Sequence, residues 1–262
     1  TATYDGVSGS AVVNVVPGSL HHIGLVPSSA SVQVGQTRQF TATGYDIYNN
    51  VLTGLTFTWA TNIGTVDATG LFTARTTPGV GVVTAQSGTV TGTANVQVTT
   101  GDIDHIVVSP DPVSVVVGES RQFSAIAYDF YNNVKSPVSF TWTTDVGSIT
   151  PGGLFTAQTT PGLGTVTATS GSVSGYASVT VLVGSVYLIA VAPDPVSVTV
   201  GGTQTFSATA YDEYDNVVTG VTFDWNTNVG TIDASGLLTA QITPGTGIVQ
   251  ATADSVIGTA AV

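Results

Sequence analysis

Cysteine and methionine are both absent from this chain of 262 residues. Without cysteine, the chain forms no disulfide and no thiolate metal site. The absence also disfavours a secreted protein of the ordinary disulfide-using type, although it is compatible with a secreted microbial protein. Because not even residue 1 is methionine, we expect the sequence to be a processed product or a fragment of a longer chain.

Positive charge is scarce as well. Four lysine and arginine residues stand against 16 acidic residues, which gives a formal net charge of −12. This balance offers no basic surface for nucleic acid or for anionic lipid. No run of about 18 apolar residues occurs, so the sequence predicts no membrane span. Charged residues make up only 8% of the chain and threonine about one residue in six, a composition that favours strands over disorder.

Several kinds of residue recur along the chain at a fixed step of 83 residues. The tryptophans Trp59, Trp142 and Trp225 follow this step. Other landmarks that follow it are Gly35, Gly118 and Gly201; Phe40, Phe123 and Phe206; Asp46, Asp129 and Asp212; and Pro78, Pro161 and Pro244. Since no insertion or deletion breaks the register, the sequence predicts a tandem array of one small domain.

The step divides the chain into three repeats and a partial one. We expect residues 18–100, 101–183 and 184–262 to form repeats 1, 2 and 3. Residues 1–17 align with the last two strands of a repeat, and we interpret them as the end of a truncated upstream repeat. The alternative is that this N-terminal hairpin docks on another molecule. The junctions contain no flexible linker, so we expect a rod-like array.

Each repeat contains about seven short runs of alternating apolar and polar residues, separated by turns rich in glycine and proline. In repeat 2, for example, residues 121–128 and 139–143 alternate in this way. A period of two residues indicates strands, and no run has the period of a helix. The pattern predicts an all-β fold of two-sheet sandwiches. We expect their cores to contain Trp59, Trp142, Trp225, Phe40, Phe123 and Phe206, with each tryptophan between the two sheets.

The order of the landmarks resembles that of bacterial immunoglobulin-like repeats. In repeat 1 the matching segments are Val34–Thr37, Phe40–Ala42, Tyr45–Val51, Phe57–Trp59, Gly64–Ala74, Thr77–Gly79 and Thr91–Val96. Such Big-type repeats occur in intimin- and invasin-type adhesins, in S-layer proteins and in other prokaryotic surface fibres. The resemblance implies tandem immunoglobulin-like sandwiches that are extracellular, on the cell surface of a prokaryote, and that catalyse no reaction.

The best candidate site is a loop of the form Tyr-Asp-x-Tyr-(Asn/Asp)-Asn-Val that occurs once in each repeat. Because oxygen-rich loops bind calcium, calcium is the candidate cofactor. The candidate ligands are Asp46, Asn50, Asp129, Asn133, Asp212, Asp215 and Asn216. However, the loops of repeats 1 and 2 each offer a single carboxylate. The alternative is a turn in which the aspartate accepts hydrogen bonds from backbone N–H groups.

Other chemistry has little support. Asp102, Asp104 and Asp111 are candidates for a calcium site at one junction, but they do not recur together at the other. The histidines supply no set of three metal ligands, and we expect His22 and His105 to take part in packing. No nucleophile motif and no recurring carboxylate pair points to catalysis, so we expect no enzyme activity. Threonine rows could bind ice or sugar, but here threonine alternates with valine and forms no long regular row.

We therefore expect a structural or assembly protein, an extracellular array that forms the shaft of an adhesin or the subunit of a surface filament, sheath or S-layer. Its expected partners are a second copy of itself, through end-to-end or lateral contacts, or neighbouring repeats of a longer chain. Cell-surface glycan is a further candidate partner. Two alternatives stay open: a binding module in which one repeat recognises a glycan or a host receptor, and an accessory segment of a large secreted enzyme.

Overall fold

A computed structural model describes residues 1–262. Every regular element is a β-strand, and the chain has no helix that is long and apolar enough to cross a membrane. Backbone proximity divides the chain into two compact units. Unit 1 comprises residues 1–105 and 127–137, and unit 2 comprises residues 106–126 and 138–262. One loop of repeat 2 therefore groups with repeat 1.

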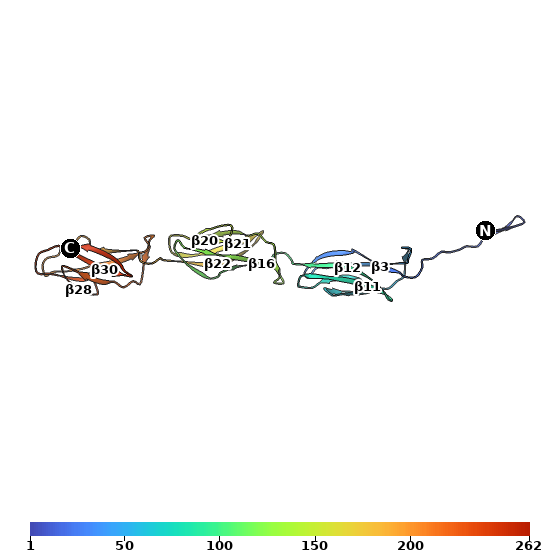
Figure 1. The fold of residues 1–262 in the computed structure, drawn as a ribbon, viewed down its shortest axis with the longest axis horizontal. Coiled ribbons are helices and arrows are strands. Elements are labelled where there is room, and N and C mark those ends of the chain that lie inside the picture. The colour runs from blue at the N-terminus through green and yellow to red at the C-terminus, as the bar shows by residue number, and fades with distance from the viewer. The chain divides into compact units, whose positions relative to one another are not determined.

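The N-terminal segment is a small hairpin followed by residues without regular structure (Figure 1). The hairpin places Ala2 opposite Gly9, and the equivalent residues of repeat 1, Ala85 and Gly92, lie opposite each other as well. All of its residues are exposed. The hairpin thus has the strand register of a repeat without a sandwich around it. Its strands are β1 (Ala2–Tyr4) and β2 (Val7–Gly9).

Repeat 1 is a sandwich of three short sheets (Figure 1). Its strands are β3 (His22–Val26), β4 (Ser29–Gln33), β5 (Thr37–Gln39), β6 (Thr41–Tyr45), β7 (Val51–Leu52), β8 (Thr58–Thr61), β9 (Gly64–Val66), β10 (Leu71–Ala74), β11 (Gly79–Ser87) and β12 (Val90–Thr99). The sheets have the strand orders β3-β6-β7, β5-β10-β9 and β4-β12-β11-β8. All neighbouring strands are antiparallel except β4 and β12, which are parallel.

The strands of repeat 1 return in the other repeats at the step of 83 residues. In repeat 2 they are β13 (His105–Ser109), β14 (Val113–Val116), β15 (Ser120–Gln122), β16 (Ser124–Tyr128), β17 (Val134–Lys135), β18 (Thr141–Thr144), β19 (Gly147–Ile149), β20 (Leu154–Ala157), β21 (Gly162–Ser170) and β22 (Val173–Leu182). In repeat 3 they are β23 (Leu188–Ala192), β24 (Thr203–Thr205), β25 (Ser207–Tyr211), β26 (Val217–Val218), β27 (Asp224–Thr227), β28 (Gly230–Ile232), β29 (Leu237–Ala240), β30 (Ile248–Ala253) and β31 (Val256–Ala261).

This architecture confirms the predicted all-β fold of tandem immunoglobulin-like sandwiches. Repeat 3 departs from this pattern, because residues 196–199, the counterparts of the parallel strand β14, lie in no strand, and β30 begins at Ile248 instead of at Gly245, the counterpart of Gly162. The repeat boundaries expected from the sequence stay a prediction, since the two compact units do not follow them.

Alternation of side chains explains why these residues form a sandwich. In β12 the side chains of Ala94, Val96 and Val98 are buried, whereas the intervening Asn95 and Gln97 are exposed. Successive residues of a strand point to opposite faces of the sheet. The apolar set therefore turns to the core of the repeat and the polar set to solvent.

The centre of each core is a pair of large side chains at equivalent positions. In repeat 1 the rings of Phe40 and Phe72 meet edge to face, with centroids 6.2 Å apart. In repeat 2, Phe123 and Phe155 form the same arrangement at 5.9 Å. Repeat 3 has Phe206 and, in place of the second ring, Leu238; all six side chains are at most 2% exposed.

The tryptophans lie at the margin of the cores, not at their centres. Trp59 and Trp225 are partly buried and pack against the cores of repeats 1 and 3, and Trp142 is also partly buried. A Cβ atom on Gly70, which has a φ of +85°, would lie 2.8 Å from the ring of Trp59. The tryptophan thus covers a glycine turn beside the core, because only glycine leaves room for the ring there.

Candidate functional site at the repeat junctions

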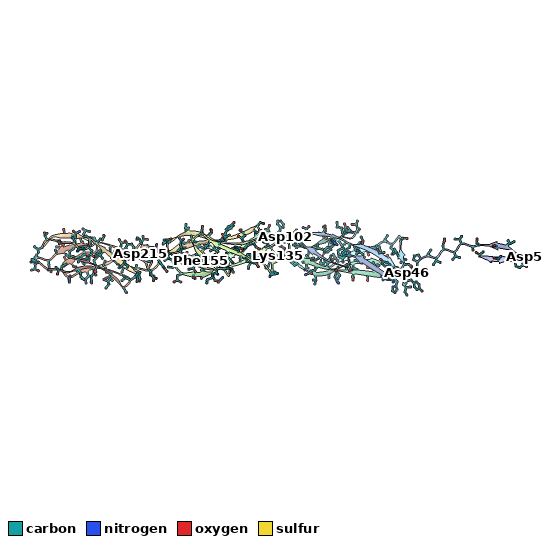
Figure 2. All side chains as sticks on the ribbon, turned by 90° about the horizontal axis from the view of Figure 1, so that it is seen from above. Asp5, Asp46, Asp102, Lys135, Phe155 and Asp215 are labelled. Atoms are coloured by element: carbon teal, nitrogen blue, oxygen red, sulfur yellow. The ribbon has the colours of Figure 1, made fainter.

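Each repeat contains one loop that is organised by a buried aspartate. We name these loops the junction loops; they are residues 46–50, 129–133 and 212–216. Asp46, Asp129 and Asp212 are each 1% exposed, and they are the chain's only buried polar or charged residues. Figure 2 places Asp46 at the end of repeat 1 that the N-terminal segment enters. Such buried carboxylates need several hydrogen bonds to offset the loss of hydration.

The Asp46 carboxylate accepts four hydrogen bonds. Its Oδ1 accepts from the backbone N–H groups of Tyr48 and Asn50, both at 2.9 Å. Its Oδ2 accepts from the backbone N–H of Gly18 at 2.9 Å and from the side-chain amide of Asn50 at 3.0 Å. Asn49 closes the turn with a φ of +64°, a left-handed conformation that asparagine tolerates. The carboxylate thus satisfies donors that the tight loop leaves without backbone partners.

The other two junction loops repeat this arrangement. The Oδ2 atoms of Asp129 and Asp212 accept from the backbone N–H groups of Gly101 and Gly184, both at 2.9 Å. Within each loop the aspartate also accepts from the backbone N–H groups two and four residues ahead, at 2.9–3.0 Å. In all three cases the aspartate therefore ties the loop to the segment through which the chain enters the repeat.

These hydrogen bonds keep the aspartates ionised. The side-chain amide of Asn50 and the backbone N–H of Gly18 lower the pKa of Asp46 to about 2. Burial raises the pKa of Asp129, but hydrogen bonds from Gly101 and Asn133 outweigh it, and the net pKa is lowered. The pKa of Asp212 is lowered in the same way against the effect of burial. A carboxylate that accepts several N–H bonds is stabilised in its charged form.

In unit 1 the junction loop of repeat 2 contacts repeat 1. The side-chain amide of Asn133 donates to the carbonyl oxygen of Thr76 at 2.8 Å and also to Asp129. The ring of Tyr131 covers Gly35, where an added Cβ would collide with the tyrosine hydroxyl. The loop thus joins two repeats through a hydrogen bond and an aromatic contact.

A lysine lies beside this junction. Lys135, which follows the loop, donates from Nζ to the carbonyl oxygen of Gly101. Figure 2 shows Lys135 near Asp102, the next residue along the chain from Gly101. Asp102 itself accepts from Gln33 of repeat 1 at 3.2 Å. Since the aligned positions 52 and 218 hold Leu52 and Val218, this lysine contact belongs to one junction alone.

In unit 2 the junction loop of repeat 3 makes the same two contacts with repeat 2. The side-chain amide of Asn216 donates to the carbonyl oxygen of Thr159 at 2.7 Å. The ring of Tyr214 covers Gly118, again too closely for a Cβ atom. Gly35 and Gly118 have φ values of +72° and +74°, so both the backbone conformation and the tyrosine require glycine.

Calcium binding at these loops stays a prediction that the geometry does not favour. The groups that surround each aspartate are N–H donors, whereas a calcium ion needs several converging oxygen ligands. The chain has no group of three acidic or histidine side chains placed to hold a metal ion. Asp215, the additional acid of the third loop, is exposed and has a φ of +63°.

The remaining candidates from the sequence have separate partners. Asp104 lies 3.0 Å from His105 Nδ1, and Asp111 accepts from the backbone N–H of Ser178 at 2.7 Å. The rings of His22 and His105 stack on Tyr45 and Tyr128, with centroids 5.0 and 5.2 Å apart. Sequence reasoning did not identify Thr76 and Thr159 as acceptors, because a backbone carbonyl has no signature in the sequence. The recurring glycines Gly35 and Gly118 were the sequence signal that could have pointed to these contacts between repeats.

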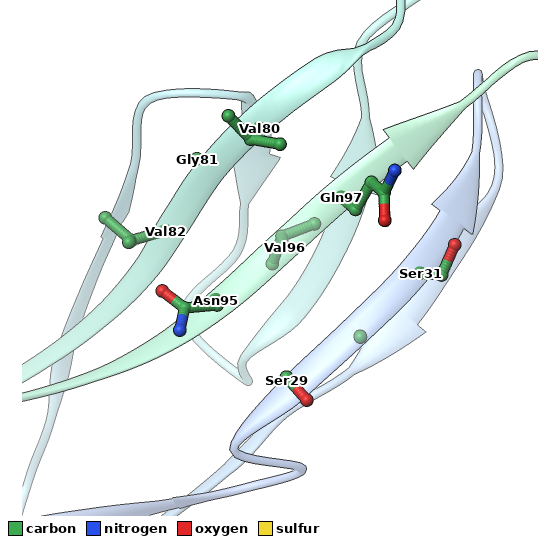
Figure 3. Close-up of a pocket in the computed structure, with 9 residues that line it drawn as sticks. Ser29, Ser31, Val80, Gly81, Val82, Asn95, Val96 and Gln97 are labelled. Atoms are coloured by element: carbon green, nitrogen blue, oxygen red, sulfur yellow. The ribbon is translucent and has the colours of Figure 1, made fainter.

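A shallow groove of about 660 Å³ lies on the sheet of β4, β12 and β11 in repeat 1 (Figure 3). Its polar lining consists of the exposed side chains of Ser29, Ser31, Asn95 and Gln97, together with the flanks of Val80 and Val82. No titratable side chain lines the groove. The lining does not recur, since the positions of Ser29, Val80 and Asn95 hold Pro112, Leu163 and Ser178 in repeat 2. The groove therefore offers an open sheet surface and no catalytic group.

Comparisons with known proteins found one related sequence and several solved structures of similar fold. No family model matches the chain. Ice-binding protein 1 of Shewanella frigidimarina is 32% identical over 203 residues, which cover 74% of this chain and 22% of that protein. The chain thus spans about a fifth of the length of this relative.

Solved structures with a similar fold include FdeC and InvD. The Escherichia coli adhesin FdeC is 22% identical over 95% of this chain and 99% of that chain, with a TM-score of 0.49. InvD of Yersinia pseudotuberculosis is 19% identical over 92% of this chain and 95% of that chain, with a TM-score of 0.44. Identities of this size are a likeness of fold alone.

Proposed function

We propose that this chain is a structural segment of an extracellular bacterial protein. In this proposal its immunoglobulin-like repeats form the shaft of an adhesin or the subunit of a surface filament or S-layer. The chain performs no catalysis and holds other parts of an assembly at a distance. Neighbouring repeats, in the same chain or in a second copy, are its principal partners.

The observation that carries the proposal is the repeated junction loop. The hydrogen bonds from Asn133 to Thr76 and from Asn216 to Thr159 connect equivalent atoms of successive repeats. Tyr131 and Tyr214 cover equivalent glycines. A chain of independent domains would not need the same contacts at each junction. A shaft does, because every flexible junction would shorten its mean reach.

Small-angle X-ray scattering of the full chain tests this proposal. We expect its radius of gyration to be the same at low and at physiological salt. A matched control carries a short Gly/Ser insertion between Thr100 and Gly101, and we expect its radius of gyration to fall, because a flexible junction shortens the mean reach. If the insertion leaves the radius of gyration unchanged, the junctions of the natural chain are already flexible and the structural role is wrong.

Ice binding is a second candidate function, favoured by the name of the Shewanella frigidimarina relative. The outward positions of β12 include Thr91 and Thr93, but the equivalents of Thr93 in the other repeats are Tyr176 and Thr259. The three repeats therefore do not share a row of outward-facing threonines, and the structural role has better support. An assay of ice recrystallisation with the full chain and with a Thr91→Ala/Thr93→Ala variant tests this candidate. Inhibition by the natural chain that the variant loses would favour ice binding.

Recognition of a glycan or a host receptor by a single repeat is a weaker proposal. It is supported by exposed aromatic side chains, among them Tyr176 and Tyr187 at 63% and 67% exposed. Exposed aromatic rings often mark binding surfaces, but these two lie apart on the sequence and occur in different repeats. Their scatter is the reason for ranking this function below a structural one.

A further inference from the structure

The junction between repeats 1 and 2 contains a pocket of about 350 Å³, and all of its lining belongs to unit 1. The lining includes Gln33 and Gln36 of repeat 1, and Asp102, Asp104 and Phe130 of repeat 2. We propose that this pocket binds one neutral hexose ring. The inference goes beyond the structural role, and it differs from recognition by a single repeat because the walls of the pocket come from two repeats.

Phe130 is the side chain that the structural role leaves without a task. It is 75% exposed, although it lies in a loop that contacts the preceding repeat. The equivalent positions of the other junction loops hold Ile47 and Glu213, so the loop itself needs no aromatic ring there. Because exposed apolar surface is unfavourable in water, a ligand that covers this ring gains free energy.

The two neighbouring rings of the pocket have different surroundings. Tyr131 contacts Gly35 of repeat 1. The ring of Phe130 meets that of Tyr131 edge to face, with centroids 5.3 Å apart and planes at 86°. Since most of Phe130 is exposed, a face of its ring is open to a ligand. The C–H groups on one side of a hexose ring form an apolar surface that suits the negative face of an aromatic ring.

Amide and carboxylate groups supply the hydrogen bonds that sugar hydroxyls need. Gln33 and Gln36 have exposed side chains, each with N–H donors and an oxygen acceptor. Asp102 and Asp104 offer acceptors alone. Two adjacent hydroxyl groups of a sugar can donate to a carboxylate and accept from an amide at the same time. An aromatic wall with a few polar groups at a domain interface is a common form of small-ligand site.

The charges around the pocket favour a neutral ligand. Gln33 donates to the Asp102 carboxylate at 3.2 Å, and Asp104 lies 3.0 Å from His105 Nδ1. Lys135, near Asp102 in Figure 2, donates to the carbonyl oxygen of Gly101. A cationic ligand would compete with these internal partners, and an acidic sugar would meet two carboxylates. A neutral sugar avoids both costs.

The junction between repeats 2 and 3 provides an internal contrast. Its pocket of about 320 Å³ contains no amide side chain, because Val116 and Glu119 stand at the positions of the two glutamines. Glu213 replaces the phenylalanine, and the exposed ring of Tyr187 shares the pocket with the two glutamates. We therefore expect the chain to bind one sugar, at the junction of repeats 1 and 2.

Saturation-transfer NMR with the methyl glycosides of glucose, galactose and mannose tests this inference on the full chain. We expect at least one of them to bind. Phe130→Ile, which introduces the residue that repeat 1 has at this position, should weaken that binding roughly two- to tenfold through loss of one aromatic contact. Tyr187→Ala removes an exposed ring from the other junction and is the matched control, which should bind as the natural chain does.

The Gly/Ser insertion between Thr100 and Gly101 tests whether both walls are needed. It should weaken binding at least as much as Phe130→Ile, because it separates repeat 1 from the loop. Undiminished binding would place the site within one repeat and overturn the inference. The trisaccharide of the sugar that binds then distinguishes the source: equal or tighter binding indicates a polysaccharide, and loss of binding indicates a free sugar.

Charged probes complete the test. If glucuronate or tetramethylammonium binds and no neutral glycoside does, the pocket is an ion site and the inference is wrong. It is also wrong if no neutral glycoside gives binding that depends on Phe130. X-ray scattering measures the junctions without any sugar, so an absence of sugar binding together with the expected radius of gyration would refute the pocket and leave the structural role intact.

Discussion

The junction loops of repeats 1 and 2 have the same internal hydrogen bonds but different surroundings. Asp46 and Asp129 each hold the backbone two and four residues ahead. Yet Tyr48 is 82% exposed and Tyr131 only 41%. The comparison separates two effects. Hydrogen bonds between nearby residues set the conformation of the loop, whereas the burial of its tyrosine depends on contact with a residue distant in the sequence, such as Gly35.

The comparison also explains why one aspartate recurs so regularly. If it only shaped the loop, its second oxygen would need no fixed partner. Instead Oδ2 binds the N–H of Gly18, Gly101 or Gly184, all 28 residues before the aspartate. The same carboxylate thus fixes both the loop and the path of the chain into the repeat.

The largest effect should come from acid, because it acts on all three loops at once. The lowered pKa values of Asp46, Asp129 and Asp212 mean that their contribution to stability is complete above the unfolded value of about 3.8. It is lost as the pH falls, for Asp46 towards about 2. Urea unfolding at pH 7, 4 and 2.5 should show most of the loss between the last two values. A constant midpoint would contradict the assignment.

Removal of one carboxylate should have the next largest effect. Asp129→Ala leaves the N–H groups of Gly101, Tyr131 and Asn133 without their acceptor, which should cost about 1–3 kcal/mol of unfolding free energy. Urea unfolding measures this cost. Asp46→Ala should lower stability in the same way, because the two loops have equivalent internal hydrogen bonds. If Asp46→Ala has no effect while Asp129→Ala does, the loop is held mainly by its neighbour and the comparison fails.

Two glycines test the contribution of the tyrosine contact from the opposite side of the junction. Gly118 and Gly201 both have left-handed conformations, with φ values of +74° and +70°, but only Gly118 is covered by a tyrosine. Alanine at Gly201 should cost about 1–2 kcal/mol from backbone strain alone. Gly118→Ala should cost more, because its Cβ also displaces Tyr214. Thermal unfolding of the two variants gives the difference, and equal melting temperatures would mean that the tyrosine contact contributes nothing.

The smallest effect concerns the loop asparagine. Asn133→Ala loses the hydrogen bond to Thr76 in addition to those within the loop, whereas Asn50→Ala loses only the latter. We expect Asn133→Ala to be the more destabilising by about 0.5 kcal/mol, the low end of the range for an exposed hydrogen bond. Urea unfolding of both variants measures this difference. An equal loss in the two variants would show that the contact with the carbonyl oxygen is not formed in solution.

Most of the fold could be predicted from the sequence. The step of 83 residues, the alternation of side chains and the glycine turns identified the strands and their repetition. The arrangement of side chains inside the core was predicted less well. The sequence placed Phe40, Phe123 and Phe206 in the core, but it did not identify Phe72 and Phe155 as ring partners. The tryptophans were expected between the sheets, and they are only partly buried beside the core. Alternation indicates which side of a strand is apolar, and it does not indicate how deep a given side chain lies.

The sequence located the candidate site but left two interpretations of it open. The recurring acids and amides drew attention to the right loops, first as calcium ligands and alternatively as a turn that caps backbone N–H groups. Only the three-dimensional structure shows that N–H donors surround each aspartate. An oxygen-rich sequence is common to both arrangements, because the same carboxylate can accept from an amide or bind a cation.

The sequence by itself determined the repetition, the strand content and the position of the loops, because these depend on neighbouring residues and on a period. Only the tertiary structure decided which loops are covered and by what. Asn133 meets Thr76 across 57 residues, and Tyr131 meets Gly35 across 96 residues. Contacts between a side chain and a distant backbone atom follow from packing, and the backbone atom is the same in every residue.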